Sequence, residues 1–355
     1  MNILHLNPEL NITCGVSKSI YYICKELKSE ANHSIICFGG DAIDNFLREG
    51  LRVIVIRKPS SILSYTFLVF SLIKLIHFHK IDIIHSHHRI FDSLSFIIQF
   101  FVKVKTVTSV HSKVIGKKMF SYKADKLIAV SKTISNHLIT YYHKPESKIK
   151  LINNFVSEGN LLKNNEVKFH RKNQSKKTII LFVGRLSLEK GVDILLEAIK
   201  IIREKFSNEN FLLQMIGNGP LKEYCSNFIH KYQLPASIIE PTNKIEPYYR
   251  QADIVVLPSR VDPFPSVMLE AGLFQKPFIG SNIDGMAELI RNEETGILCE
   301  PENANKLAEA IQKFIENEKF ARTLAKNLHF IVKKSYTADN ILPKYEKLYL
   351  ELYNG

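Results

Sequence analysis

The chain has 355 residues, of which 45% are hydrophobic and 23% charged, with 15 glycines and 13 prolines. This is the composition of an ordinary folded protein, and it excludes disorder as the main state. At roughly 100 to 200 residues per domain, the length predicts two domains, each large enough to bury its own core.

Cysteine usage and the N-terminus indicate the compartment. The five cysteines are widely spaced without a CxxC pair, which predicts neither a disulfide framework nor a structural zinc site. The first ten residues, MNILHLNPEL, lack the basic start and the cleavage site of a signal peptide. The longest apolar run, residues 62–73, is shorter than the ~20 residues that cross a bilayer. We therefore expect a cytoplasmic protein without a membrane-spanning segment.

The positive charge is unevenly distributed. Residues 1–175 hold 25 Lys and Arg against 12 Asp and Glu, whereas residues 176–355 hold 23 of each kind. Residues 103–150 contain 11 basic residues and only two acids. This asymmetry predicts an anionic partner for the first half, namely a phospholipid surface, a phosphorylated substrate or nucleic acid. The alternative is a solvated basic face without a partner. RNA-binding signatures with interleaved aromatic residues are absent, so we expect no nucleic-acid partner.

Short apolar runs recur through the first half of the chain. Expected strands cover residues 1–6, 34–38, 52–56, 81–85, 106–111 and 126–130, and residues 16–29 have the apolar spacing of a helix. Such alternation predicts a parallel sheet with helices on both faces.

The pattern stops at residues 156–177, a polar stretch without periodicity that predicts an interdomain linker. A second series follows, with expected strands at 178–183, 211–216, 254–257 and 277–280 and helices at 192–203, through Glu270, after Asp284 and after Ala304. The predicted fold class is α/β, with two domains, residues 1–155 and 178–337, facing each other across a cleft.

The first motif, Phe182-Val-Gly-Arg-Leu-Ser-Leu-Glu-Lys-Gly191, joins an expected buried strand to an expected helix. Gly184 permits a tight turn, and Arg185 and Lys190 lie on the loop that leads to the helix N-terminus. Free N–H groups, the helix dipole and two cations together suit a diphosphate. Two surface cations on an ordinary loop are the alternative.

The second motif, residues 258–271, places Asp262 on a loop and Glu270 about a turn and a half inside the helix that follows. Pro265 suits the first turn of that helix, where no N–H is required. The spacing suits one ligand held by its hydroxyl groups at two points. The alternative is a loop acid and a solvated helix acid.

Together with Gly285-Met-Ala-Glu-Leu-Ile and Thr295-Gly-Ile-Leu, these motifs resemble those of the family 4 retaining glycosyltransferases of GT-B fold, which consists of two Rossmann-like domains. The resemblance covers essentially the whole chain and is more specific in the second half. It implies transfer of a hexose or N-acetylhexosamine from a nucleotide diphosphate sugar to a lipid-linked or polysaccharide acceptor, with no cofactor and no metal. It also implies a role in bacterial surface-polysaccharide or lipopolysaccharide biosynthesis, and a C-terminal helix, about residues 338–355, that returns to the first domain.

The resemblance also implies roles for the motif residues. Arg185 and Lys190 would bind the donor diphosphate and stabilise the charge on the leaving nucleotide. Glu270 would hold the ribose hydroxyls, and Asp262 would contact the donor sugar.

Four further matches complete the implied site. Gly15, after the first strand, would let the chain approach the phosphates, although the family often has two glycines there. His111 would lie near the reacting sugar, and the turn containing Gly217 and Asn218 would border the nucleotide.

One departure from the family concerns Glu-x-Phe-Gly, which here reads Asp262-Pro-Phe264-Pro265. The acid is shorter, and the second proline offers no N–H, so Ser266 and Val267 would supply the backbone donors beside Phe264. We interpret this as a sub-group variant rather than as loss of activity.

Two other features have competing interpretations. His85 and His87 are two residues apart at an expected strand end, and without a nearby carboxylate or cysteine they favour a structural or cleft-lining role over a metal site. The apolar segments 61–77 and 91–102 favour core helices, with an interfacial role at a membrane as the alternative.

Two rival functions stay open, a nucleotide-sugar epimerase of GT-B fold and a catalytically inactive peripheral membrane-binding protein. The basic first half leads us to expect peripheral attachment to the anionic inner face of the cytoplasmic membrane. The sequence leaves open the donor base, the sugar, the acceptor, the linkage and the oligomeric state.

Overall fold

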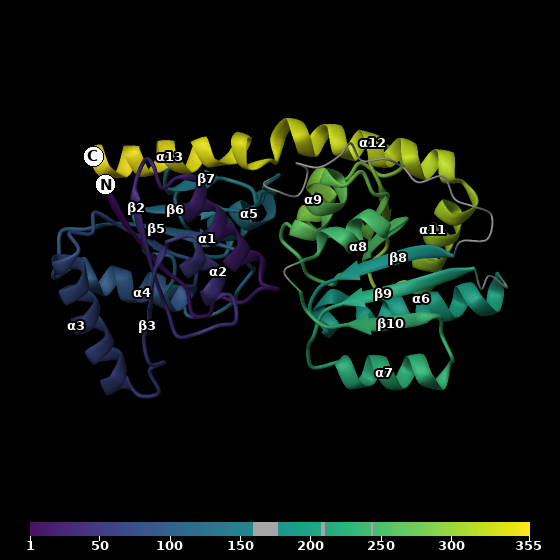
Figure 1. Ribbon diagram of the computed structural model, residues 1–355. Helices are drawn as coiled ribbons and strands as arrows, with labels where there is room; N and C mark the ends of the chain where they lie inside the picture. The colour runs from purple at the N-terminus through teal and green to yellow at the C-terminus, as the bar shows by residue number, and fades with distance from the viewer. Residues whose placement is uncertain (159–176, 207–209, 243) are drawn as a thin grey trace. The chain divides into compact units, whose positions relative to one another are not determined.

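The computed structural model describes residues 1–158, 177–206, 210–242 and 244–355. Most of the expected linker, residues 159–176, therefore lies outside the described residues. The chain divides into two compact units (Figure 1). The first unit contains residues 1–154 and 339–355, and the second contains residues 155–338.

The first unit is built on a seven-stranded parallel sheet with the order β3-β2-β1-β4-β5-β6-β7. Its strands are β1 (Asn2–Leu6), β2 (Asn32–Cys37), β3 (Arg52–Val55), β4 (Ile83–Ser86), β5 (Lys105–Val110), β6 (Lys126–Ala129) and β7 (Ile149–Leu151). Its helices are α1 (Gly15–Glu26), α2 (Ile43–Arg48), α3 (Ile62–Phe78), α4 (Arg89–Ile98), α5 (Lys132–Thr140) and α13 (Ala338–Asn354), with 3₁₀ turns η1 (Lys118–Phe120) and η2 (Glu146–Lys148). The central strands are buried on both faces, as expected for a parallel sheet covered by helices.

The second unit is built on a six-stranded parallel sheet with the order β10-β9-β8-β11-β12-β13. Its strands are β8 (Thr178–Val183), β9 (Phe211–Ile216), β10 (Ala236–Ile239), β11 (Ile254–Leu257), β12 (Phe278–Ser281) and β13 (Ile297–Cys299). Its helices are α6 (Val192–Lys205), α7 (Lys222–Lys231), α8 (Glu246–Gln251), α9 (Ser266–Leu273), α10 (Asp284–Leu289), α11 (Ala304–Glu316) and α12 (Glu318–Ser335), with the 3₁₀ turn η4 (Leu188–Lys190).

In each sheet the strand order reverses at one place. The second sheet grows outward from β8 to β9 and β10, and β11 then pairs with the other side of β8. The first sheet reverses in the same way between β1 and β4. In open parallel sheets, ligands bind beyond the carboxyl ends of the strands at such a reversal. The loops after β8 and β11 are therefore where the fold favours a ligand in the second unit.

The C-terminal helix α13 belongs to the first unit although it follows the second in sequence. Its buried face includes Tyr345 and Tyr349, and the hydroxyl of Tyr349 lies 2.7 Å from Nδ1 of His85 on β4. The segments at the two ends of the second unit are hydrogen-bonded to each other. The amide of Val156 donates to the carbonyl of Tyr336 at 3.0 Å, and the amide of Ala338 donates to the carbonyl of Val156 at 2.9 Å.

Within the described ranges, no helix combines the length and the hydrophobicity that crossing a bilayer requires.

Candidate active site

Glycines hold the loops at the carboxyl edge of the second sheet close together. Gly191 ends η4 with a φ of 67°, and a Cβ there would lie 1.9 Å from the carbonyl oxygen of Pro258. Gly217, after β9, has a φ of 157°, and its Cβ would lie 1.9 Å from the carbonyl oxygen of Gly184. Only glycine permits both the conformation and the approach, so the loops after β8, β9 and β11 form one packed edge.

An ion pair joins two of the predicted site residues. Nζ of Lys190, on the loop after β8, donates to Oδ2 of Asp262, on the loop after β11. The side chain of Lys190 is 26% exposed and that of Asp262 is 10% exposed. A cation and an acid from the two motifs are therefore in direct contact at the reversal of strand order, and only the lysine retains substantial solvent contact.

Arg260, on the loop after β11, holds that loop against the loop after β8 by hydrogen bonds. Its Nη1 and Nη2 each donate to one carboxylate oxygen of Asp193 at 2.8 Å. Its Nη1 also donates to the carbonyl of Leu188 at 2.6 Å, and its backbone N–H donates to the carbonyl of Glu189 at 2.7 Å. Burial alone would raise the pKa of Asp193, but the bonds from Arg260 lower it overall. The bonds to Leu188 and Glu189 hold the η4 turn that carries Lys190, and the planar two-point contact with Asp193 orients the guanidinium.

Glu270 is held in place by a tyrosine. It lies on α9 with only 9% exposure, and its Oε2 accepts a 2.6 Å hydrogen bond from the hydroxyl of Tyr249 on α8. The ring of Tyr249 stacks on Phe274, with centroids 5.2 Å apart. Burial, and secondarily the neighbouring Glu270, raise the pKa of Tyr249 well above its usual value, so this hydroxyl stays a donor.

The segment that departs from the family pattern leads into α9. Phe264 is buried, with its ring centroid 5.5 Å from that of Tyr336. Pro265 is the N-cap of α9, with φ −68° and ψ 133°, rather than a residue of the first helical turn. Its extended ψ places the start of the helix one residue later, so Ser266 and Val267 are the first two helical residues.

The remaining predicted residues of the second unit are exposed. The Oδ1 of Asn218 accepts from the backbone N–H of Gly219 at 2.7 Å, which shapes the turn after β9. Arg185 is exposed on the loop after β8 and makes no ion pair or hydrogen bond with any described residue.

Two predicted residues belong to the first unit. Gly15 is the first residue of α1, directly after the loop that follows β1. His111 follows β5 directly, and its ring lies 5.8 Å from that of His87, centroid to centroid. Burial lowers the pKa of His111 to about 4, so its imidazole is neutral at physiological pH. Its Nε2 is buried without a hydrogen-bond partner in the described part of the chain.

Sequence reasoning missed several residues of this edge. Tyr249 and Arg260 support the predicted residues. Arg260 lies within the second motif but was not singled out there, and no motif marks Tyr249. Ser187 and Ser259, on the loops after β8 and β11, are buried with hydroxyls that find no partner among described residues. In the first unit, the structure brings His5 to His85 and His87, which had no candidate partner in the sequence.

Comparisons of the sequence and of the structure with known proteins give the same answer. Residues 13–159 match the family model described as Glycosyltransferase Family 4, and residues 163–329 match the one described as Glycosyl transferases group 1. The glycosyltransferase MJ1607 of Methanocaldococcus jannaschii is 26% identical over 76% of this chain and 75% of its own. The capsular polysaccharide biosynthesis glycosyltransferase CapM of Staphylococcus aureus is 27% identical over 66% of this chain and 63% of its own. The solved structure of HepE from Anabaena in complex with UDP-glucose superposes with a TM-score of 0.86 at 19% identity, over 99% of this chain and 100% of that one.

Proposed function

The chain belongs to the family 4 glycosyltransferases and has their GT-B fold, and from this premise we propose that it transfers a hexose or N-acetylhexosamine from a nucleotide diphosphate sugar to an acceptor hydroxyl, with retention at the anomeric carbon. The observation that carries the proposal is the ion pair between Lys190 and Asp262 on the loops where the strand order reverses. Such a pair would offer a cation to the diphosphate and an acid to the sugar at one point.

The proposed reaction exchanges one bond at the anomeric carbon for another. The bond to the diphosphate oxygen breaks, the acceptor oxygen bonds to the same face, and the acceptor proton passes to the departing phosphate. Negative charge then accumulates on the phosphate, where Arg185 and Lys190 would stabilise it without a metal ion. Because Arg185 has no ion-pair partner among the described residues, its charge is available for this role.

Donor binding would break the ion pair, because the diphosphate would replace Asp262 as the partner of Lys190. A diphosphate bound by Lys190 releases Asp262, whose carboxylate could then accept hydrogen bonds from sugar hydroxyls. Glu270, oriented by Tyr249, would accept from the ribose hydroxyls. The first helical N–H groups of α9, at Ser266 and Val267, would serve the anionic donor as further hydrogen-bond donors.

The first unit would supply the acceptor side. Neutral His111 can donate or accept one hydrogen bond to the reacting sugar. The proposed acceptor is lipid-linked or a polysaccharide, in keeping with the capsular polysaccharide assignment of the relative CapM. We place the enzyme in the cytoplasm, attached peripherally to the inner face of the membrane.

A basic and apolar segment, residues 113–123, supports the membrane contact. Lys113, Lys117 and Lys118 are exposed there, and the same segment exposes Ile115, Met119 and Phe120 by 73%, 68% and 59%. Anionic lipid attracts such cations by about 1 kcal/mol each, and the apolar side chains can enter the interface.

Hydrogen bonds hold this segment against the body of the first unit. Nη1 of Arg89 donates to the carbonyl of Gly116 at 3.0 Å, and the hydroxyl of Tyr142 donates to the carbonyl of Val114 at 2.8 Å. The segment would therefore meet a membrane in a defined orientation.

A donor screen tests the proposed function. We expect one of UDP-, GDP- and ADP-sugars to raise the melting temperature, starting with UDP-glucose because HepE is solved with it. The transferred sugar should keep its anomeric configuration by NMR, and the initial rate should not depend on added Mg²⁺. Absence of binding by all three donor classes, or an inverted product, would contradict the proposal.

A further inference from the structure

One face of the first sheet carries histidines where apolar side chains are usual. His5 on β1 and His85 on β4 are paired across the two strands, so their side chains leave the sheet on the same face. His87 is two residues beyond His85 and shares this face. His33 on β2 is two residues before Ile35, the partner of His5, and shares it too. All four histidines are at least nine-tenths buried.

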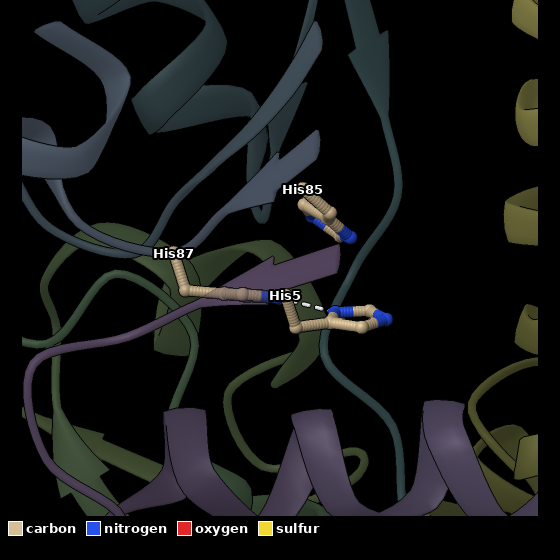
Figure 2. Close-up of side chains that lie close together, drawn as sticks. All are labelled: His5, His85 and His87. Atoms are coloured by element: carbon tan, nitrogen blue, oxygen red, sulfur yellow. Dashed lines mark hydrogen bonds between the residues drawn. The ribbon is translucent and has the colours of Figure 1, made fainter. Parts of the chain in front are cut away.

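Three of these imidazoles converge. Nδ1 of His5 lies 3.1 Å from Nε2 of His87, and Figure 2 shows the His87 ring reaching toward His5 with His85 beside them. The ring centroids of His85 and His87 are 4.0 Å apart. One nitrogen from each of the three lies within 4.8 Å of the others. Two imidazole ligands of one tetrahedral zinc ion, each about 2.0–2.1 Å from the metal, would be separated by roughly 3.3 Å, close to the distance between His5 and His87.

The surroundings resemble those of metal-binding histidines, which use their second nitrogen to bond a neighbour. Nε2 of His5 lies 2.9 Å from Nδ1 of His33. The two nitrogens of His85 lie 2.7 Å from the Tyr349 hydroxyl and 2.8 Å from Oγ of Ser109. Both nitrogens of His85 therefore have a hydrogen-bond partner in the present orientation of the ring, and a metal would replace one of these two contacts.

One nitrogen of His87 has no partner among the residues that the structure describes, and a metal bound through Nε2 would leave it so. Nδ1 of His87 is buried and has no hydrogen-bond partner in the described part of the chain. Burial, followed by the neighbouring histidines, lowers the pKa of His5, His85 and His87 well below the usual value. A histidine binds a metal through an imidazole nitrogen that carries no proton.

We propose that His5, His85 and His87 form a transition-metal site in the first unit, with zinc as the fitting ion. An all-imidazole set suits zinc and its neighbours in the first transition series, whereas Mg²⁺ and Ca²⁺ require oxygen ligands. His5 would carry its proton on Nε2, toward His33, and His87 on Nδ1, so that their lone pairs face the ion.

The His85 ring must turn toward the other two to complete the set. The metal would link β1 to β4 at the point where the strand order of the first sheet reverses. It takes no part in the proposed transfer, whose cations are in the second unit, so each proposal can fail independently.

The test uses the full chain, stripped of metal and titrated with Zn²⁺ and with Co²⁺. We expect one equivalent of either ion to bind, a rise in melting temperature with Zn²⁺, and a visible Co²⁺ spectrum of nitrogen ligation without a thiolate band. His87→Gln should weaken Zn²⁺ binding by about 100-fold or more. The matched control is His230→Gln, an exposed histidine of α7 in the second unit, which should bind as the wild type does.

Three results would overturn the site. The first is a wild-type chain that binds neither ion. The second is unchanged affinity in a folded His87→Gln variant. The third is a thiolate band that Cys24→Ser removes, because Cys24 forms a second possible ligand group with His5 and His33. If the His87 variant does not fold, the wild-type Co²⁺ spectrum still shows whether the ligands are imidazoles or include a thiolate.

Discussion

The hydroxyl of Tyr249 donates a 2.6 Å hydrogen bond to Oε2 of Glu270, and both residues are buried. They lie 21 positions apart on two helices, α8 and α9. One bond from a rigid, stacked ring thus fixes the carboxylate that we propose for the donor ribose. The role of Tyr249 as a support can therefore be tested in the same way as the role of Glu270.

Tyr249→Phe should weaken nucleotide binding by about tenfold, because a hydrogen bond to a charged group contributes about 1.5–3 kcal/mol and part of the orientation survives through stacking. Glu270→Gln should weaken it at least as much. Both should act mainly on affinity, since a ribose contact is the same in ground and transition states. Calorimetric titration with the free nucleotide measures this. Tyr248→Phe, on the same helix, is the control, and an equal loss there would contradict the role of Tyr249.

Arg185→Ala and Lys190→Ala should each reduce kcat by about 10²-fold or more, because each removes a preorganised cation from the charge that develops on the phosphate. Initial rates at saturating donor test this. Lys319→Ala, an exposed lysine of α12, serves as the control and should leave the rate unchanged. Normal turnover in both loop variants would remove the basis of the proposed mechanism.

Gly191→Ala should destabilise the protein by more than about 2 kcal/mol, because it combines left-handed strain of about 1–2 kcal/mol with a clash against the backbone of Pro258. Gly50→Ala separates the two causes. Gly50 also has a positive φ, 74°, but nothing lies within 4 Å of its Cβ position, so strain alone should act. Urea denaturation measures both variants. Equal losses would show that the approach of Pro258 does not matter.

Replacing Lys113, Lys117, Lys118 and Lys123 by Glu should release the enzyme from anionic vesicles, because each lysine near the surface contributes about 1 kcal/mol. Nucleotide affinity should stay constant, since the proposed donor residues lie in the second unit. Co-sedimentation at low salt, with neutral vesicles as the control, tests this. If the wild-type chain does not bind anionic vesicles, a soluble acceptor is favoured.

The strands that sequence analysis predicted are the ones with long apolar runs, such as Thr178–Val183 and Phe211–Ile216, which the structure reproduces to the residue. The edge strands β7, β10 and β13 escaped prediction. Length alone is not the reason, since β11 is as short as β10 and was predicted from its unbroken apolar sequence, Ile-Val-Val-Leu. Polar residues interrupt two of the runs, since β7 reads Ile-Lys-Leu and β10 contains a serine, and β13 has only three residues.

Residues of the candidate site could be predicted where they belong to a short sequence motif. Lys190 and Asp262 each lie in a recognisable motif, but their contact spans 72 positions and follows from strand order, not from either motif. Arg260 and Asp193 are paired across 67 positions in the same way. His5 and His33 gave no signal alone, because only strand pairing reveals that they share a face with His85.

The second unit is inserted within the first, between Asn154 and Asp339. During synthesis, residues 1–154 therefore leave the ribosome without α13, and the face that holds His85 lacks its Tyr349 partner until α13 emerges. Because domains generally fold as units while the chain grows, we expect the second unit to fold completely before the first can close. A stop codon before α13 would then spare the second unit and leave the first unit incomplete.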